Sequence, residues 1–248
     1  MEDTKKFGLL GRNISYSFSV GYFTEKFERE NATNCSYQNF DLATLDEFPA
    51  VINNTPDLKG LNITIPYKKE ILPFLEKINK KALEIGAVNT IKITKNKKLK
   101  GYNTDYYGFK KAIKPLLKPH HTKALILGTG GASNAVAFAL KKLGISYQYV
   151  SRNPIDNQLT YADLDRETFN QYTIIINCTP LGTFPNINDC PPLPYSYFNS
   201  KHLAFDLIYN PAETTFLKKA KSFGAATTNG YQMLVFQAEK AWKIWNRK

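Results

Sequence analysis

The sequence predicts an α/β protein with two domains, and three observations support this. The chain has 248 residues, which is long enough for two modest domains with buried cores. Hydrophobic residues make up 43% of the chain, as in ordinary globular proteins. Segments with strand and helix periodicity alternate along the sequence, which is typical of a parallel sheet covered on both faces.

The first half of the chain forms one predicted α/β unit. Strands are predicted at 5–11, 35–40 and 58–64, and helices at 18–30, 43–53 and 68–84, the last interrupted by Pro73. Two short alternating runs, 87–94 and 99–105, are joined by the polar residues 95–98. This pattern predicts a β-hairpin with a lysine-rich tip.

The second half repeats the alternation, which predicts a doubly wound sheet with helices on both faces. After a helix at 106–117, strands are predicted at 124–128, 145–151, 173–177 and 203–207. Helices are predicted at 135–144, 212–224 and 231–245. The final helix carries a wide apolar stripe with both tryptophans, so we expect it to pack in a core.

Charge and composition narrow the classes of function. The formal net charge of +12 suggests a polyanionic partner, but no nucleic-acid-binding motif accompanies it, so we expect no nucleic acid. Cys35, Cys178 and Cys190 form no CxxC pair, and the three histidines lack metal-ligand spacing, so we expect no metal. The N-terminal residues lack a secretory signal and no apolar run approaches the roughly 18 residues of a membrane helix, which predicts a cytoplasmic protein without a membrane partner.

A glycine-rich turn at 128–133, GTGGAS, lies directly between a predicted buried strand and a predicted helix. Glycines in this position let the backbone approach phosphates, which then lie at the helix N-terminus. The surrounding strand, turn, helix and second strand fit the roughly 30-residue unit of a dinucleotide site. The residues that we expect to contact the pyrophosphate are Gly128, Thr129, Gly130, Gly131 and Ala132.

The end of the following strand indicates which dinucleotide binds. An NAD site places an acidic residue there to bind the ribose 2′-hydroxyl, but this chain has Ser151, Arg152 and Asn153. A guanidinium forms charge-assisted hydrogen bonds with a 2′-phosphate. The sequence therefore favours NADP as the cofactor.

Nine motifs occur in an order and spacing that resemble the shikimate dehydrogenase family over nearly the whole chain. They are ISYSFSV (14–20), LNITIPYKKE (61–70), GAVNTI (86–91), GYNTDYYGF (101–109), GTGGAS (128–133), SRN (151–153), INCTPLG (176–182), DLIYNPAETTFL (206–217) and NGYQMLVFQA (229–238). The resemblance implies a substrate-binding and catalytic domain at 1–105, an NADP-binding Rossmann domain at 106–229, and packing of 230–248 back onto the first domain. It also implies reversible, NADPH-dependent reduction of 3-dehydroshikimate to shikimate, in the biosynthesis of chorismate and aromatic amino acids.

The resemblance assigns the chemistry to Lys68 and Asp105. Hydride transfer to a ring carbonyl carbon requires a proton donor at the oxygen. We expect the Lys68 ammonium to supply that proton and to stabilise developing alkoxide charge, and Asp105 to orient Lys68 and bind the substrate hydroxyl.

The remaining expected contacts also come from the resemblance. Ser17 and Ser19 would hold the substrate carboxylate with Tyr209 nearby, while Thr64, Asn89 and Gln237 would bind hydroxyls. Thr179 and Leu207 would line the nicotinamide side, and Gly230 would lie near the carboxamide. A small polyol needs several such converging groups, because each hydroxyl must be distinguished from the others.

Three alternative interpretations stay open at this point. The first is a quinate/shikimate dehydrogenase with relaxed substrate or NAD use. The second is a sensor or repressor that kept the fold without the chemistry, against which the intact Lys68 and Asp105 argue. The third, a nucleic-acid-binding protein, rests on charge alone. The sequence does not fix the oligomeric state, for which a homodimer is one option.

Overall fold

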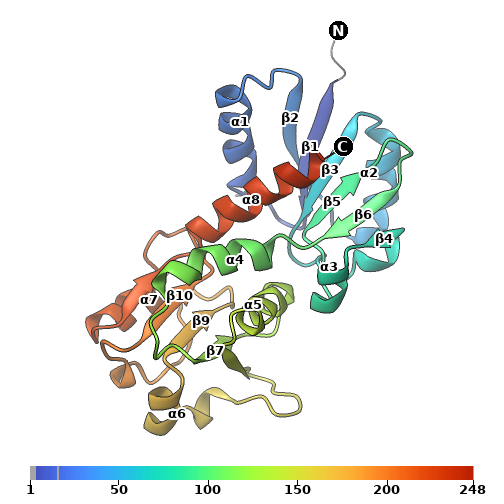
Figure 1. The fold of residues 1–248 in the computed structure, drawn as a ribbon. Coiled ribbons are helices and arrows are strands. Elements are labelled where there is room, and N and C mark those ends of the chain that lie inside the picture. The colour runs from blue at the N-terminus through green and yellow to red at the C-terminus, as the bar shows by residue number, and fades with distance from the viewer. Residues whose placement is uncertain (1–3, 16, 248) are drawn as a thin grey trace. The chain divides into compact units, whose positions relative to one another are not determined.

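The structure is a computed structural model that describes residues 4–15 and 17–247. Tyr16, within the motif at 14–20, lies outside the described residues. The chain divides into two compact units. Unit 1 comprises Met1–Thr104 and Ala238–Lys248, and unit 2 comprises Asp105–Gln237. Each unit is built around its own sheet (Figure 1).

Unit 1 contains a mixed six-stranded sheet in the order β2-β1-β3-β5-β6-β4. The parallel strands are β1 (Lys5–Gly11), β2 (Cys35–Asp41) and β3 (Leu58–Ile63). The predicted hairpin is confirmed as β5 (Thr90–Ile93) and β6 (Leu99–Tyr102), and β5 pairs antiparallel with β3. The short edge strand β4 (Lys77–Ile78) pairs parallel with β6.

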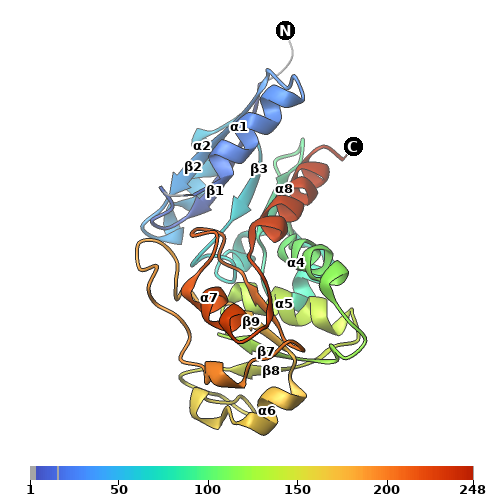
Figure 2. The ribbon, with the colours of Figure 1, turned by 90° about the vertical axis from the view of Figure 1, so that its left-hand side faces the viewer.

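Helices cover both faces of this sheet. Figure 2 shows α1 (Ser19–Arg29) running alongside β1 and β2. α1 and the last residues of α8 (Tyr231–Trp245) share a core with Phe7 of β1, whereas α2 (Phe48–Asn54) and α3 (Lys80–Ile85) share the core of the opposite face with Leu61 of β3. Trp245 stacks on Phe7 with 4.8 Å between ring centroids, and its indole N–H donates to the Ile91 carbonyl at 2.9 Å.

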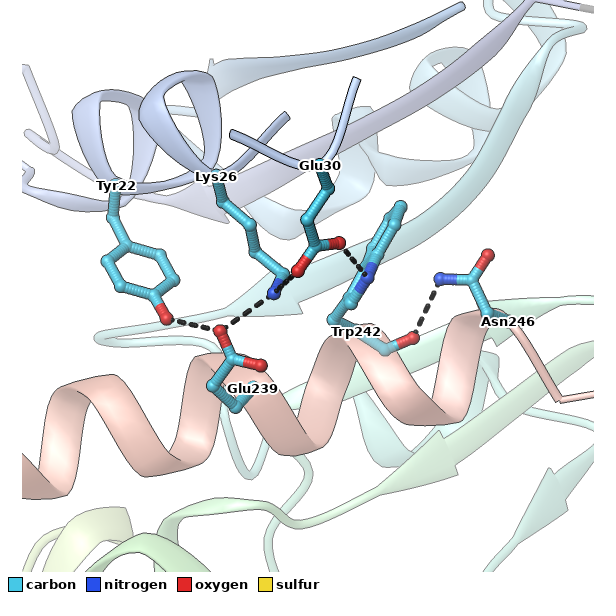
Figure 3. Close-up of polar contacts among 6 residues, drawn as sticks. All are labelled: Tyr22, Lys26, Glu30, Glu239, Trp242 and Asn246. Atoms are coloured by element: carbon cyan, nitrogen blue, oxygen red, sulfur yellow. Dashed lines mark hydrogen bonds and ion pairs between the residues drawn. The ribbon is translucent and has the colours of Figure 1, made fainter. Parts of the chain in front are cut away.

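A polar cluster around the buried Lys26, the Lys26 cluster, joins α1 to α8 within unit 1 (Figure 3). The side chain of Lys26 is only 2% exposed, and its ammonium lies 2.6 Å from Glu30 Oε1 and 2.8 Å from Glu239 Oε1. Tyr22 donates to the same Glu239 oxygen at 2.6 Å, and the Trp242 indole donates to Glu30 Oε2 at 3.0 Å. Because ionic contacts have directional partners, this cluster fixes the register of α8 on an otherwise apolar surface.

Unit 2 contains a five-stranded, all-parallel sheet in the order β11-β10-β9-β7-β8. Its strands are β7 (Lys123–Leu127), β8 (Ser146–Val150), β9 (Ile174–Asn177), β10 (Leu203–Asp206) and β11 (Ala226–Thr228). Its helices are α4 (Asp105–Ile113), α5 (Gly131–Lys141), α6 (Arg166–Gln171), α7 (Thr215–Ser222) and the first residues of α8.

The two faces of this sheet have separate cores. Ile126 and Ile176 pack with α4, α5 and α8, whereas Leu125 and Ile175 pack with α6 and α7. Successive strand residues are thus buried on opposite faces, which explains the continuous apolar runs in the sequence. The predicted α/β fold class, with a doubly wound second unit, is confirmed.

The helix predicted over 68–84 is wrong. The chain there makes turns, a single 3-10 turn at Leu72–Phe74, the strand β4 and only then α3. Pro73 lies in the 3-10 turn, where it has no N–H to continue a helix. Asn79 caps α3 by accepting from the Lys81 amide, and Gly86 ends it with a left-handed φ of 70°.

Three smaller differences concern helix ends and one unpredicted helix. α5 begins at Gly131 rather than 135, and α4 ends at Ile113, before a 3-10 turn. The short helix α6 was not predicted, although Asp165 caps it by accepting from the Thr168 amide. Among the described residues, no helix has the length and apolar character needed to cross a membrane.

Candidate active site

The loop that carries Ser17 and Ser19 follows β1 and is held by β2. The Asp41 carboxylate accepts from the amides of Asn13 at 2.7 Å and Ile14 at 3.0 Å. The Ser17 amide donates to the Ile14 carbonyl, and the Ser19 amide donates to Ser17 Oγ at 3.2 Å. Both serines therefore belong to one closed turn at the N-terminus of α1.

Thr64 and Lys68 lie in the loop that follows β3. The Thr64 amide donates to the Leu10 carbonyl at 2.9 Å, and a Cβ at Gly11 would lie 2.5 Å from the Thr64 methyl carbon. Lys68 is half-buried, and its carbonyl accepts from the Val88 amide at 2.8 Å. The backbone of Lys68 is thereby fixed to the segment that leads into β5.

Asn89 is buried and braces the segment that ends at Thr104. Its Oδ1 accepts from the Thr104 amide at 2.6 Å, and its Nδ2 donates to Thr104 Oγ1 at 3.0 Å. The Asn62 amide donates to the Asn89 carbonyl and to Thr90 Oγ1, and Asn62 Oδ1 accepts from Tyr37 at 2.9 Å. Burial raises the pKa of Tyr37 above its usual range, so its hydroxyl stays protonated.

The sequence analysis did not identify Asn62 as a functional residue. The feature that could have indicated it is an asparagine within an otherwise apolar strand. Its buried side chain links Tyr37 of β2 to the Asn89 loop across the sheet. A buried amide of this kind is retained only where its hydrogen bonds are satisfied.

Asp105 and Gln237 both belong to unit 2, whereas Lys68 belongs to unit 1. Asp105 is buried at the first position of α4, and Gln237 is half-buried on α8. A Cβ at Gly108 would lie 2.5 Å from the Met233 carbonyl oxygen and 3.1 Å from the backbone nitrogen of Gln237. Glycine is therefore needed at position 108 for α4 to approach α8 this closely.

The glycine turn has the predicted position between β7 and α5. Gly128 has a φ of 95°, which favours glycine, and a Cβ there would lie 3.1 Å from the methyl carbon of Thr179. Gly130 precedes the first helical residue, Gly131, and Ser133 Oγ donates to the Gly130 carbonyl at 2.7 Å. Because Gly130 has no side chain to cap the helix, the first amides of α5 are available to an anion. Thr129 and Ala132 complete this turn and the start of α5.

Arg152 lies just beyond β8, as predicted, and its side chain is exposed. Ser151 Oγ accepts from the Asn153 amide at 3.2 Å, which turns the chain at this point. An exposed guanidinium in this turn can form the paired hydrogen bonds that a phosphate accepts. Asn153 is also exposed. Because its amide donates to Ser151 Oγ, all three predicted residues belong to one turn.

The residues expected on the nicotinamide side converge within unit 2. Thr179 donates to Asn177 Oδ1 through its amide at 3.0 Å and its hydroxyl at 2.6 Å. The Leu207 amide donates to the Asn177 carbonyl, and Gly230 packs so closely on the Leu207 carbonyl that a side chain would collide. Tyr209 follows this segment and is half-buried. The described residues contain no group of three or more side chains that could hold a metal ion.

The fold and these loops define a two-unit α/β oxidoreductase that uses a dinucleotide. The chain is 37% identical to the NADP-dependent shikimate dehydrogenase of Methanococcus aeolicus, covering 98% of this chain and 92% of the relative. The chain therefore belongs to the shikimate dehydrogenase family, and the predicted resemblance is confirmed.

Further comparisons agree with this assignment. The chain is 34% identical to the NADP-dependent shikimate dehydrogenase of Caldanaerobacter subterraneus, covering 98% of this chain and 91% of that protein. Residues 9–91 match the family model described as the shikimate dehydrogenase substrate binding domain. The crystal structure of the Thermus thermophilus enzyme with NADP(H) and shikimate superposes with a TM-score of 0.86 at 30% identity, covering 98% of this chain and 94% of that one.

Proposed function

We propose that this chain catalyses the reversible, NADPH-dependent reduction of 3-dehydroshikimate to shikimate. The observation that carries the proposal is the convergence in unit 2 of the glycine turn, Thr179 and Leu207, at the carboxyl ends of adjacent parallel strands. Ligands of open parallel sheets bind at this edge. Unit 2 then binds the cofactor and unit 1 supplies most of the substrate contacts.

The reaction adds a hydride and a proton to the substrate carbonyl. NADPH, held by the glycine turn and by Arg152, would supply the hydride when bound. Lys68 donates a proton to the carbonyl oxygen, which becomes the hydroxyl of shikimate, and its ammonium stabilises the charge that develops on that oxygen. Asp105 orients Lys68 and accepts a hydrogen bond from a neighbouring substrate hydroxyl.

The closed turn of Ser17 and Ser19 supports binding of the substrate carboxylate, with Tyr209 contributing from unit 2. Thr64, Asn89 and Gln237 bind the ring hydroxyls. Asn89 is suited to this role because Oδ1 is engaged with the Thr104 amide, which fixes the orientation of the amide group. A rigid donor of this kind distinguishes among hydroxyls better than a freely rotating one.

The cofactor contacts follow from the turns in unit 2. The backbone of Gly128–Ala132 and the N-terminus of α5 hold the pyrophosphate. Ser151, Arg152 and Asn153 hold the 2′-phosphate, and Gly230, which packs on the Leu207 carbonyl, lies near the carboxamide.

The test follows the absorbance of NADPH with shikimate and NADP, repeated with NAD and with quinate. We expect turnover with shikimate and NADP, and its absence contradicts the proposal. Lys68→Met should lower kcat about a thousandfold, because it removes the proton donor, and should leave NADPH affinity unchanged. Lys69→Met is the matched control, because Lys69 is the exposed neighbour on the same loop. Near-normal turnover of Lys68→Met removes Lys68 from the mechanism.

A further inference from the structure

Asp206, the last residue of β10, is a buried carboxylate in unit 2. Its Oδ1 accepts from Asn177 Nδ2 at 3.1 Å and from the Ile208 amide at 3.0 Å, and its Oδ2 accepts from Thr214 Oγ1 at 2.6 Å. Three donors thus converge on one side chain from β9, from the turn after β10 and from the start of α7.

The contact with Asn177 fixes the orientation of that amide. A carboxylate without a proton only accepts hydrogen bonds, so Nδ2 of Asn177 must face Asp206. Oδ1 of Asn177 is then turned toward Thr179, where it accepts from both the amide and the hydroxyl. Nδ2 also donates to the Leu181 carbonyl at 3.4 Å, so Asp206 accepts the shorter of its two hydrogen bonds. Without Asp206 only that longer contact would keep the amide from turning its N–H groups toward the donors of Thr179.

The contact with Ile208 fixes the second loop. The Ile208 carbonyl accepts from the Gly230 amide at 2.9 Å, and Leu207 donates to the Asn177 carbonyl at 3.0 Å. The loop after β9, the turn after β10 and the entry to α8 are therefore held together by hydrogen bonds that meet at Asp206.

We propose that Asp206 is the positioning residue for the nicotinamide end of the cofactor, acting through Asn177 on Thr179 and through Ile208 on Leu207 and Gly230. This inference rests on the proposed function, because it assigns these three residues to the nicotinamide. The adenosine end, at Arg152, is expected to be independent of Asp206, because the turn that holds it follows β8 at the edge of the sheet.

The test compares two ligands on the full chain: NADPH, and 2′,5′-ADP, which carries the 2′-phosphate but no nicotinamide. Asp206→Ala and Asn177→Ala should each weaken NADPH binding about tenfold, as expected for the loss of one or two oriented hydrogen bonds. Both variants should bind 2′,5′-ADP within about twofold of the wild type, because phosphate contacts are unaffected. A purely structural role would weaken both ligands equally, and that result would overturn the proposal.

Two matched variants complete the design. Asp206→Asn keeps an Oδ1 acceptor for Asn177 and Ile208 and should retain NADPH affinity. Thr214→Val removes the hydrogen bond to Oδ2 of the same carboxylate, together with the α7 cap in which Thr214 Oγ1 accepts from the Leu217 amide, and should also retain NADPH affinity. If Asp206→Ala does not fold, Asn177→Ala and Asp206→Asn decide: unchanged NADPH binding in the first, or its loss in the second, contradicts the proposal. A wild type that binds neither ligand contradicts the proposed function instead.

Discussion

The Lys26 cluster predicts which of its charged side chains contributes most to the stability of unit 1. Lys26 is almost fully buried, whereas the side chains of Glu30 and Glu239 are 39% and 33% exposed. Replacing Lys26 by Met removes the buried charge and keeps the length of the side chain, and water can still reach both carboxylates. Replacing Glu239 by Gln instead leaves a buried ammonium with a single charged partner.

The expected magnitudes follow from this asymmetry. Glu239→Gln should lower the free energy of unfolding by about 2–3 kcal/mol, the value for a charge-assisted hydrogen bond next to a buried charge. Lys26→Met should cost about 1 kcal/mol, because what it loses is contact with two hydrated carboxylates. The larger effect should therefore come from the more exposed residue.

Urea unfolding of the full chain at neutral pH measures both values, with Glu28→Gln as the control on an exposed glutamate of α1, the helix that carries Lys26. The denaturant slope should stay constant, so that midpoints report stability.

The pH dependence of the unfolding free energy gives a second measurement. Burial opposes ionisation of Glu239, but hydrogen bonds from Lys26 and Tyr22 outweigh it and lower its pKa. The stabilisation from the ionised Glu239 should thus be lost as the pH falls through that lowered pKa. A larger loss of stability in Lys26→Met than in Glu239→Gln would refute the reasoning.

Three further predictions concern unit 2. Burial lowers the pKa of His121 and His202, and in each ring Nδ1 accepts a backbone N–H. The unfolded chain therefore binds protons at a higher pH than the folded chain, so the free energy of unfolding should fall as the pH drops below about 6.5. Thermal unfolding of the double variant His121→Asn/His202→Asn should show a flatter pH dependence. Burial raises the pKa of Asp206 to about 6 from its ordinary 3.8. The contribution of Asp206 to the free energy of unfolding should therefore decline by about 3 kcal/mol as the pH rises from about 4 to about 6. The difference in stability between the wild type and Asp206→Asn, measured across this range, should show the decline. Arg152→Gln should raise KM for NADPH about tenfold or more and leave KM for NADH unchanged, and equal effects on both would remove Arg152 from the 2′-phosphate site.

Much of the fold was predictable because its signals are local. The apolar runs of β7 and β9 and the wide stripe of α8 depend only on periodicity, and all three lie where they were predicted. The segment after β3 has an apolar content that suggests a helix. Its chain direction is set instead by Pro73 and by pairing of β4 with β6, which is a contact between distant residues.

The residues of the candidate site likewise fall into those that local sequence patterns predict and those that depend on distant partners. The glycine turn and Arg152 were predictable because their spacing from a strand carries the meaning. Asp206 and Asn62 were not, because a polar residue in an apolar strand has no role until its partners are known. The pairing of Lys26 with Glu239 spans 213 positions of the chain, so no local pattern could indicate it.

The division of the chain affects the order in which the protein can fold during synthesis. Unit 2 is one continuous segment, so all of it is translated before the final helix is complete. Unit 1 needs both of its segments, because Phe7 of the first segment stacks on Trp245 of the second. The nascent sheet of unit 1 therefore carries an uncovered aromatic surface until α8 has been translated, and of the two units only unit 2 can reach its final structure from one continuous segment.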